Sequence, residues 1–177
     1  RIRAATACYL TNDRHADLLI GRGNTVHAAS GASLASGSLT AIADTYSVGT
    51  LGDFAGIGDF NGDGTRDFAV LDTGTGIVHL VTSETFAGDA VNLGSTPAAT
   101  RFGAVSDLMA SNGATAPKLV ALGNMNGDSN GANRLYYFAV TGRSGSTVWY
   151  AVRGRTGTGA ISPTGAPTFA GNQVLVN

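Results

Sequence analysis

Oxygen-bearing residues gather in one short stretch of the chain, here named the 59–67 loop. Its candidate ligand residues are Asp59, Asn61, Asp63, Thr65 and Asp67. All of them occupy alternate positions, so a turning loop directs their oxygen atoms toward one point, and calcium prefers about six to eight oxygen ligands. Gly64 permits the sharp turn that brings the backbone carbonyl of Thr65 inward. The stretch therefore predicts a calcium site.

Two other structures would place similar residues in such a loop. An EF-hand requires a bidentate Glu at its twelfth position, where this chain has Val70, and it requires flanking helices, whereas Phe68–Leu71 is an apolar run of strand length. A solvated turn stays open as an alternative, because Asn-Gly and Asp-Gly are also common hairpin signals. Three carboxylates so close together repel one another unless something neutralises them, which favours calcium.

Two further loops resemble the first one incompletely. The second candidate site, a weaker one, has the residues Asn124, Asn126, Asp128, Asn130 and Asn133. Only Asp128 is charged there, and calcium affinity follows the number of charged ligands. In the 9–17 loop, Tyr9 and Thr11 stand where two ligands belong, and Arg14 replaces the glycine. We expect that this loop has lost its site or holds Arg14 paired with a carboxylate.

Short apolar or alternating runs bounded by turn residues recur along the chain, and they predict strands rather than helices. The runs are Leu18–Ile20, Thr25–Ala28, Phe68–Leu71, Ile77–Val81, Lys118–Leu122, Leu135–Val140, Thr147–Val152 and Val174–Val176. No Gly-free segment of a dozen residues carries helical periodicity. The pattern predicts an all-β fold: a sandwich, a barrel or a propeller.

An internal repeat favours the propeller. Asp17–His27 and Asp67–His79 share an acidic residue, a strand, a Gly-containing turn and a second strand that ends in Val-His. A third copy has Asn133 in place of the acid and continues to Val152. We expect about three units in a single repeat domain, over residues 1–50, 51–115 and 116–177. Closed propellers need about four to eight blades, so these units would belong to a larger or oligomer-completed ring, or form an open β-sandwich.

The loop spacing Asp-x-Asn-x-Asp-Gly-x-x-Asp resembles the blades of the FG-GAP and VCBS family, the integrin-α-like β-propellers. Phe54–Gly56 and the strand Phe68–Val70 fit the same pattern. The resemblance is close over Phe54–Val81, partial over Phe102–Val152 and weak over Cys8–Ala28. It implies that the loop joins the first two strands of a blade and that its ion is mainly structural.

Composition narrows the class of protein. The chain has 177 residues, of which 43% are hydrophobic, and this suits one domain with an apolar core. The net charge of −1 and the lack of a basic run argue against a nucleic-acid partner. No apolar stretch approaches the roughly 18 residues that span a bilayer, so we expect no membrane span. The chain starts at Arg1 without a signal-peptide pattern, so we expect a fragment or processed part of a longer precursor.

Residues of the kind that carry catalysis are not arranged for it. Nucleophile elbows, phosphate loops and zinc spacings are absent, and His27 and His79 recur at matching hairpin positions, which suits a structural role. We expect a non-enzymatic, calcium-binding module for protein binding, adhesion or scaffolding. It would act outside the cell or on its surface, where millimolar calcium fills a site of modest affinity. Its partners would be other chains or copies of itself, met through the terminal units.

Two alternatives stay open. Tyr136, Tyr137, Trp149 and Tyr150 form the main aromatic cluster, and exposed aromatic rings can stack on sugars. That favours a lectin-like propeller with glycan ligands. The chain would otherwise be an accessory propeller of a secreted hydrolase or lyase whose catalytic residues lie elsewhere.

Overall fold

The computed structural model describes residues 2–11, 13–36, 42–60, 64–82, 84, 86–95, 101–102, 115–124, 136–144, 147–154 and 174–175. Strands make up most of this part of the chain. Within these ranges, helical structure is limited to the short helix α1 (Gly31–Ala35) and the 3-10 turn η1 (Leu93–Ser95). The all-β class expected from the sequence is confirmed.

The strands form three sheets. The first sheet contains, in spatial order, β1 (Ile2–Cys8), β2 (Asp17–Arg22), β3 (Thr25–Ala29), β4 (Ile42–Ser47) and β8 (Ala90–Asn92). The second contains β5 (Leu51–Gly58), β6 (Asp67–Asp72), β7 (Ile77–Val81) and β9 (Arg101–Phe102). The third contains β10 (Thr115–Asn124), β11 (Tyr136–Ser144), β12 (Thr147–Gly154) and β13 (Val174–Leu175). Neighbours pair antiparallel, except that β8 runs parallel to β4.

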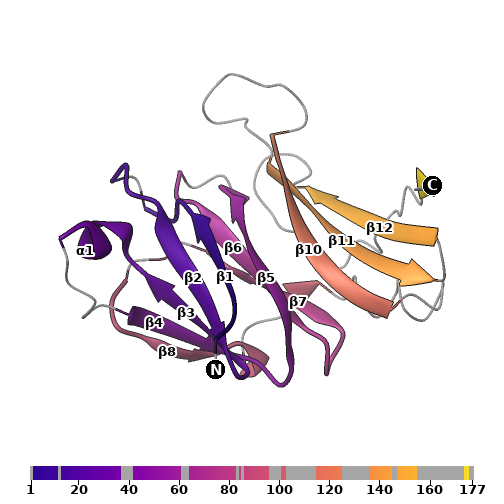
Figure 1. Ribbon diagram of the computed structural model, residues 1–177, viewed down its shortest axis with the longest axis horizontal. Helices are drawn as coiled ribbons and strands as arrows, with labels where there is room; N and C mark the ends of the chain where they lie inside the picture. The colour runs from indigo at the N-terminus through magenta and orange to yellow at the C-terminus, as the bar shows by residue number, and fades with distance from the viewer. Residues whose placement is uncertain are drawn as a thin grey trace.

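The second sheet lies between the other two (Figure 1). Successive side chains of a strand point to opposite faces, and both faces of β6 are buried. Phe68 and Val70 enter a cluster with the first sheet, whereas Ala69 and Leu71 enter a cluster with the third. The continuous apolar run of β6 is therefore explained by burial on both sides.

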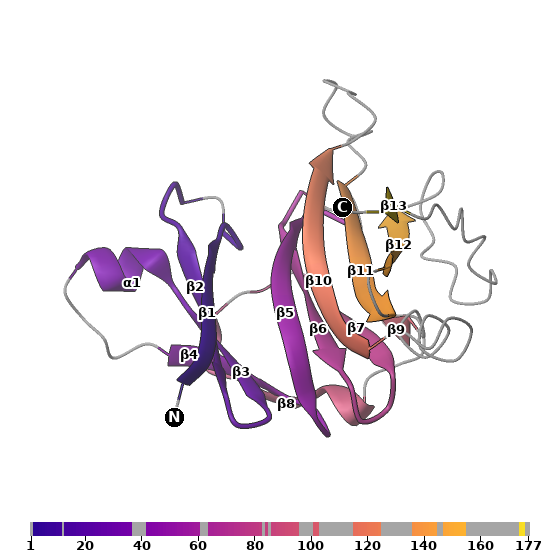
Figure 2. The same ribbon diagram turned by 45° about the vertical axis from the view of Figure 1, so that its right-hand side comes forward.

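The first strands of the three sheets lie side by side. β5 contacts β1 on one side and β10 on the other, as Figure 2 shows. The sheets are open, and the described residues do not close into a ring. This arrangement leaves one face of the first sheet and one face of the third sheet without a neighbouring sheet among the described residues.

Glycine allows the close approach between the first and second sheets. A Cβ atom added at Gly56 of β5 would lie 2.5 Å from the Cβ of Cys8 on β1. Atoms at that distance overlap, so a side chain at this position would push the two sheets apart. The burial of the Cys8 side chain against β5 raises its thiol pKa to about 12, which keeps the thiol protonated.

Candidate functional site

The 59–67 loop joins β5 to β6, the first two strands of the second sheet. The structure describes Asp59, Gly64, Thr65 and Asp67 of the predicted site, whereas Asn61 and Asp63 lie outside the described residues. The geometry given below therefore concerns the two ends of the loop.

Asp67 forms the base of the loop. Its side chain is completely buried, and its Oδ2 atom accepts a hydrogen bond of 2.7 Å from the backbone N–H of Phe60. The Phe60 ring anchors this corner in the core, with its centroid 5.5 Å from that of Phe138 on β11. The carboxylate is thus fixed at the start of β6 by the packing of two sheets.

Asp59 closes the other end of the loop. Its Oδ2 atom accepts a hydrogen bond of 2.9 Å from the backbone N–H of Gly64, where φ is +91°. The loop therefore turns back on itself at the glycine that the sequence predicts for a sharp turn. Carboxylate oxygens at both ends of a tight loop are hard ligands of the kind that calcium prefers. The described part of the loop fits the expected cation.

A calcium site needs more ligands than these two ends supply. Among the described residues, no group of three His, Cys, Asp or Glu side chains is placed to hold a metal. Asp63, the third carboxylate of the predicted site, was not included in that search because it lies outside the described ranges.

The 9–17 loop of the first sheet has a similar base. The Asp17 carboxylate is completely buried, and its Oδ2 accepts the backbone N–H groups of Leu10 at 2.7 Å and Thr11 at 3.0 Å. Its Oδ1 accepts the N–H of Gly31 at 2.9 Å. Three backbone donors thus satisfy the acceptor oxygens of this carboxylate, and the loop can close without a cation.

Arg14 occupies the turn of this loop with φ of +69°, although it carries a side chain. No ion pair joins Arg14 to a carboxylate among the described residues. Asp13 instead accepts the backbone N–H of His15 at 2.9 Å, and this bond is the main cause that lowers the pKa of Asp13.

The loops of the first and second sheets meet at one end of the molecule. The guanidinium carbon of Arg66 lies 5.0 Å from the ring centroid of Tyr9, at cation–π distance. Tyr9 remains 48% exposed. In the sequence, Tyr9 stands at a position where a metal ligand would be expected. Its contact with Arg66 of the neighbouring loop could not be predicted from the sequence.

The second candidate site lies mostly outside the described residues, which include Asn124 but not Asn126, Asp128, Asn130 or Asn133. Asn124 ends β10, directly after Gly123, which has φ of +69°. Gly123 pairs with Tyr137 in the β10–β11 ladder, as Gly58 pairs with Asp67 in the β5–β6 ladder. The strand ends are therefore built alike, while Tyr137 stands where the second sheet has its buried carboxylate.

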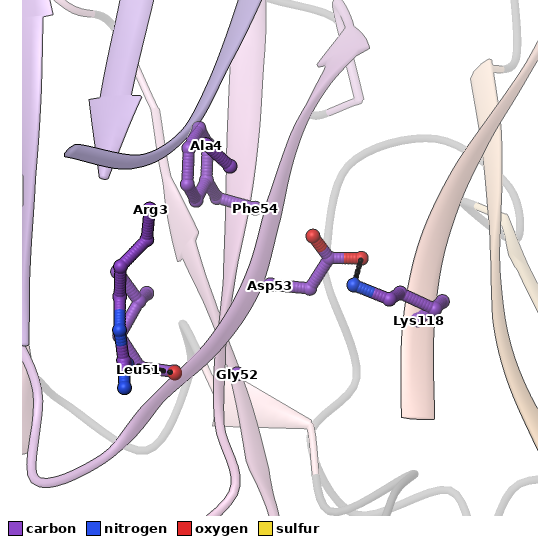
Figure 3. A pocket seen from close by; sticks show the side chains of 7 residues that line it. All are labelled: Arg3, Ala4, Leu51, Gly52, Asp53, Phe54 and Lys118. Atoms are coloured by element: carbon purple, nitrogen blue, oxygen red, sulfur yellow. Dashed lines mark hydrogen bonds and ion pairs between the residues drawn. The ribbon is translucent and has the colours of Figure 1, made fainter. Parts of the chain in front are cut away.

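A charged groove that sequence reasoning missed crosses the first strands (Figure 3). It encloses about 300 Å³ and is lined by residues of β1, β5 and β10. Asp53 accepts the N–H of Leu119 at 2.9 Å and lies 3.8 Å from the Lys118 ammonium nitrogen. Arg3 donates to the backbone carbonyls of Leu51 at 3.2 Å and Gly23 at 3.4 Å. These contacts tie the three first strands together.

Comparisons with protein families, curated proteins and solved structures give no match to this chain. Within the described part of the chain, no helix is long and apolar enough to cross a membrane.

Proposed function

We propose that this chain is a calcium-binding, non-enzymatic module of the β-propeller type, which acts outside the cell in protein binding, adhesion or scaffolding. The observation that carries the proposal is the geometry of the two described ends of the 59–67 loop. Asp59 turns back onto Gly64, and Asp67 is held at the loop base by Phe60. With Asn61 and Asp63 between them in sequence, such a loop has the oxygen ligands that calcium prefers.

Calcium would neutralise the negative charge that three carboxylates bring to the 59–67 loop. Asp17 is a single carboxylate that accepts three backbone N–H groups, whereas the 59–67 loop has three carboxylates within nine residues of sequence. Carboxylates so close together raise one another's cost of ionisation unless a cation lies between them. We therefore assign the ion to this loop and none to the 9–17 loop.

The stacking of the sheets supports blades of a propeller. The second sheet presents Phe68 and Val70 to the first sheet, and the third sheet presents Phe138 and Val140 to the second. These pairs occupy corresponding ladder positions, because Gly56 faces Phe68 and Ala121 faces Phe138. Successive units thus pack by the same pair of faces, as blades do around a common axis.

The same packing of one sheet face on the next suggests which surface of the first sheet would bind a partner. In the first sheet, Leu19 faces the second sheet, so its neighbours Leu18 and Ile20 lie on the opposite face. Both are only half-buried, although the corresponding Phe68 and Val70 are completely buried. Another copy of the chain, or another polypeptide with a similar sheet, would cover them.

Calorimetric titration with calcium tests the proposed site. Asp59→Asn keeps an oxygen that can accept the Gly64 N–H but removes the charge, and it should weaken calcium binding by about tenfold or more. Asp13→Asn is the control, because it makes the same change of charge in the 9–17 loop, to which no ion is assigned, and it should leave binding unchanged. Equal effects of the two variants, or no binding heat for the unmodified chain, would reject the site.

A further inference from the structure

A segment from the middle of the chain returns to the edge of the first sheet. We define the strap as the described residues 84 and 86–92, which follow β7 and end in β8. β8 pairs in parallel with β4, and the N–H of Thr45 donates to the carbonyl of Asp89 at 2.8 Å. The strap thus covers the edge of β4, which would otherwise present unpaired backbone groups.

Two carboxyl groups fasten the strap. Asp44 of β4 accepts the backbone N–H groups of Ala87, at 3.1 Å, and of Asp89. Glu84 accepts the N–H of Phe86 at 2.7 Å through Oε1 and the Tyr46 hydroxyl through Oε2. Asp44 and Tyr46 are two residues apart on β4, so both side chains project from the same face, and the Glu84 carboxyl that accepts the Tyr46 hydroxyl lies beside Asp44, where a hydrogen bond between the two carboxyl groups can form.

Such a bond requires a proton, because two ionised carboxylates have only acceptors. The side chains of Asp44, Tyr46 and Glu84 are at most 6% exposed, so water cannot screen repulsion between two charges there. Burial first, and then the bond with Asp44, raises the pKa of Glu84 to about 7. Burial opposes the ionisation of Asp44, yet bonds from Glu84 and from the strap N–H groups hold its pKa below the usual range. The proton therefore resides on Glu84.

The groups around this pair supply no cation. Asp44 and Tyr46 face Glu84 from β4, and Asp89 of the strap contributes further negative charge near Tyr46. Burial raises the pKa of the Tyr46 hydroxyl, which remains a donor. Among the described residues, no Lys, Arg or His forms an ion pair with either carboxyl group.

We propose that the strap is a proton-controlled clasp, in which the proton held between Asp44 and Glu84 keeps the strap on the first sheet and its loss weakens that contact. The expected direction follows from the raised pKa of Glu84. The stabilising effect is complete below the ordinary glutamate pKa, falls as the pH rises, and is lost once the pH passes about 7. Weakening exposes the β4 edge, where another strand could pair.

Amide hydrogen exchange tests the clasp. Protection of the Thr45, Ala87 and Asp89 amides, corrected for intrinsic exchange, should fall by about tenfold or more between about pH 5 and pH 7.5. Glu84→Gln keeps a donor toward Asp44 without a titrating proton, so its strap protection should not change with pH. Asp72→Asn alters a buried carboxylate away from the strap and should keep the dependence of the unmodified chain.

A second measurement needs no variant. The side-chain carbonyl of ¹³C-labelled Glu84, followed by NMR, should titrate near pH 7 in the folded chain. Titration near the ordinary glutamate pKa would overturn the proposal. So would strap protection that is independent of pH in the unmodified chain, or that falls equally in Glu84→Gln.

Discussion

Arg14 and Gly64 adopt left-handed backbone conformations at the turns of two loops, with φ of +69° and +91°. Residues with a Cβ atom enter this region at a cost of about 1–2 kcal/mol, whereas glycine does not. Among the described residues, no atom lies within 4 Å of a Cβ built at Gly64, so backbone strain is the cost of a substitution that the structure shows there. The 9–17 loop carries this backbone strain at Arg14, and the 59–67 loop avoids it by having glycine at the corresponding position.

Reciprocal substitutions should therefore shift stability in opposite directions. Gly64→Ala should lower the free energy of unfolding by about 1 kcal/mol, because alanine must adopt a positive φ. Arg14→Gly should raise it by about 0.5 kcal/mol, since the relief of strain exceeds the entropy cost of glycine. Urea unfolding of both variants measures this. If Arg14→Gly destabilises as much as Gly64→Ala, the loops do not share the turn described here.

At the scale of the elements, β1 and β5 approach each other closely at Gly56. A Cβ atom built on Gly56 would lie 2.5 Å from the Cβ atom of Cys8. The contact is between backbone-proximal atoms and not the flexible end of a side chain. It cannot relax without moving a strand, and that movement disturbs the cluster between the first two sheets.

A substitution cycle tests this contact. Gly56→Ala should cost about 1–3 kcal/mol of unfolding free energy, because it overpacks the approach of two sheets. Cys8→Gly in the same chain should recover part of that loss by removing the opposing Cβ, although Cys8→Gly alone destabilises. Chemical unfolding of the single and double variants gives the coupling between the sites. Strict additivity of the two effects would contradict the predicted clash.

The strands that the sequence predicts are those with continuous apolar or alternating runs. β6 and β7 fit that rule because they are buried in the middle of the stack. The first strands of the first and second sheets, β1 and β5, do not follow this rule, whereas β10 contains the predicted run Lys118–Leu122. β1 is mostly exposed and so lacks an apolar pattern, while β5 contains Gly52, Gly56 and Gly58, which weaken a strand signal. β4 carries the buried Asp44, whose partners lie far along the chain.

The features of the candidate site also fall into two groups: those that the sequence predicts and those that it does not. Ligand types, their spacing and the turn at Gly64 are local properties, so the sequence reveals them. The burial of Asp67 depends on packing between two sheets, and the pairing of Asp44 with Glu84 depends on the return of the strap. Local patterns contain no information about such long-range contacts.

At the scale of the whole molecule, the stack has two outer sheet faces that no other described strand covers. Ile20 lies on the outer face of the first sheet, and Val120, which is 42% exposed, lies opposite the buried Leu119 on the outer face of the third. A head-to-tail contact uses one face of each kind, so each chain would present both to its neighbours.

Light scattering at micromolar concentration tests this assembly. The unmodified chain should be larger than a monomer, because covering both faces removes apolar surface from water. Ile20→Lys and Val120→Lys should each shift the distribution toward monomer, since each interrupts one side of the contact. Asp13→Asn, in the 9–17 loop and away from both sheet faces, should leave the size distribution unchanged. A monodisperse monomer of the unmodified chain would contradict the assembly.

Calcium binding and folding are coupled if the ion binds only the folded loop. The stabilisation is then RT ln(1 + [L]/Kd), about 2.7 kcal/mol when calcium stands at about 100 times its Kd. This is a large part of the roughly 5–15 kcal/mol that stabilises a typical domain. Asp63→Ala should remove most of it, because it deletes a charged ligand from the loop. Asp128→Ala, in the weakly charged 124–133 loop, should remove little.

Thermal unfolding of the unmodified chain in millimolar calcium and in excess chelator tests the central claim most directly. We expect the midpoint to rise by about 5–10 °C with calcium, a rise that corresponds to about 2.7 kcal/mol for a chain of this size. Asp63→Ala should lose most of that shift, and Asp128→Ala should keep it. A midpoint that does not move with calcium would contradict the assignment of a structural calcium ion to the 59–67 loop.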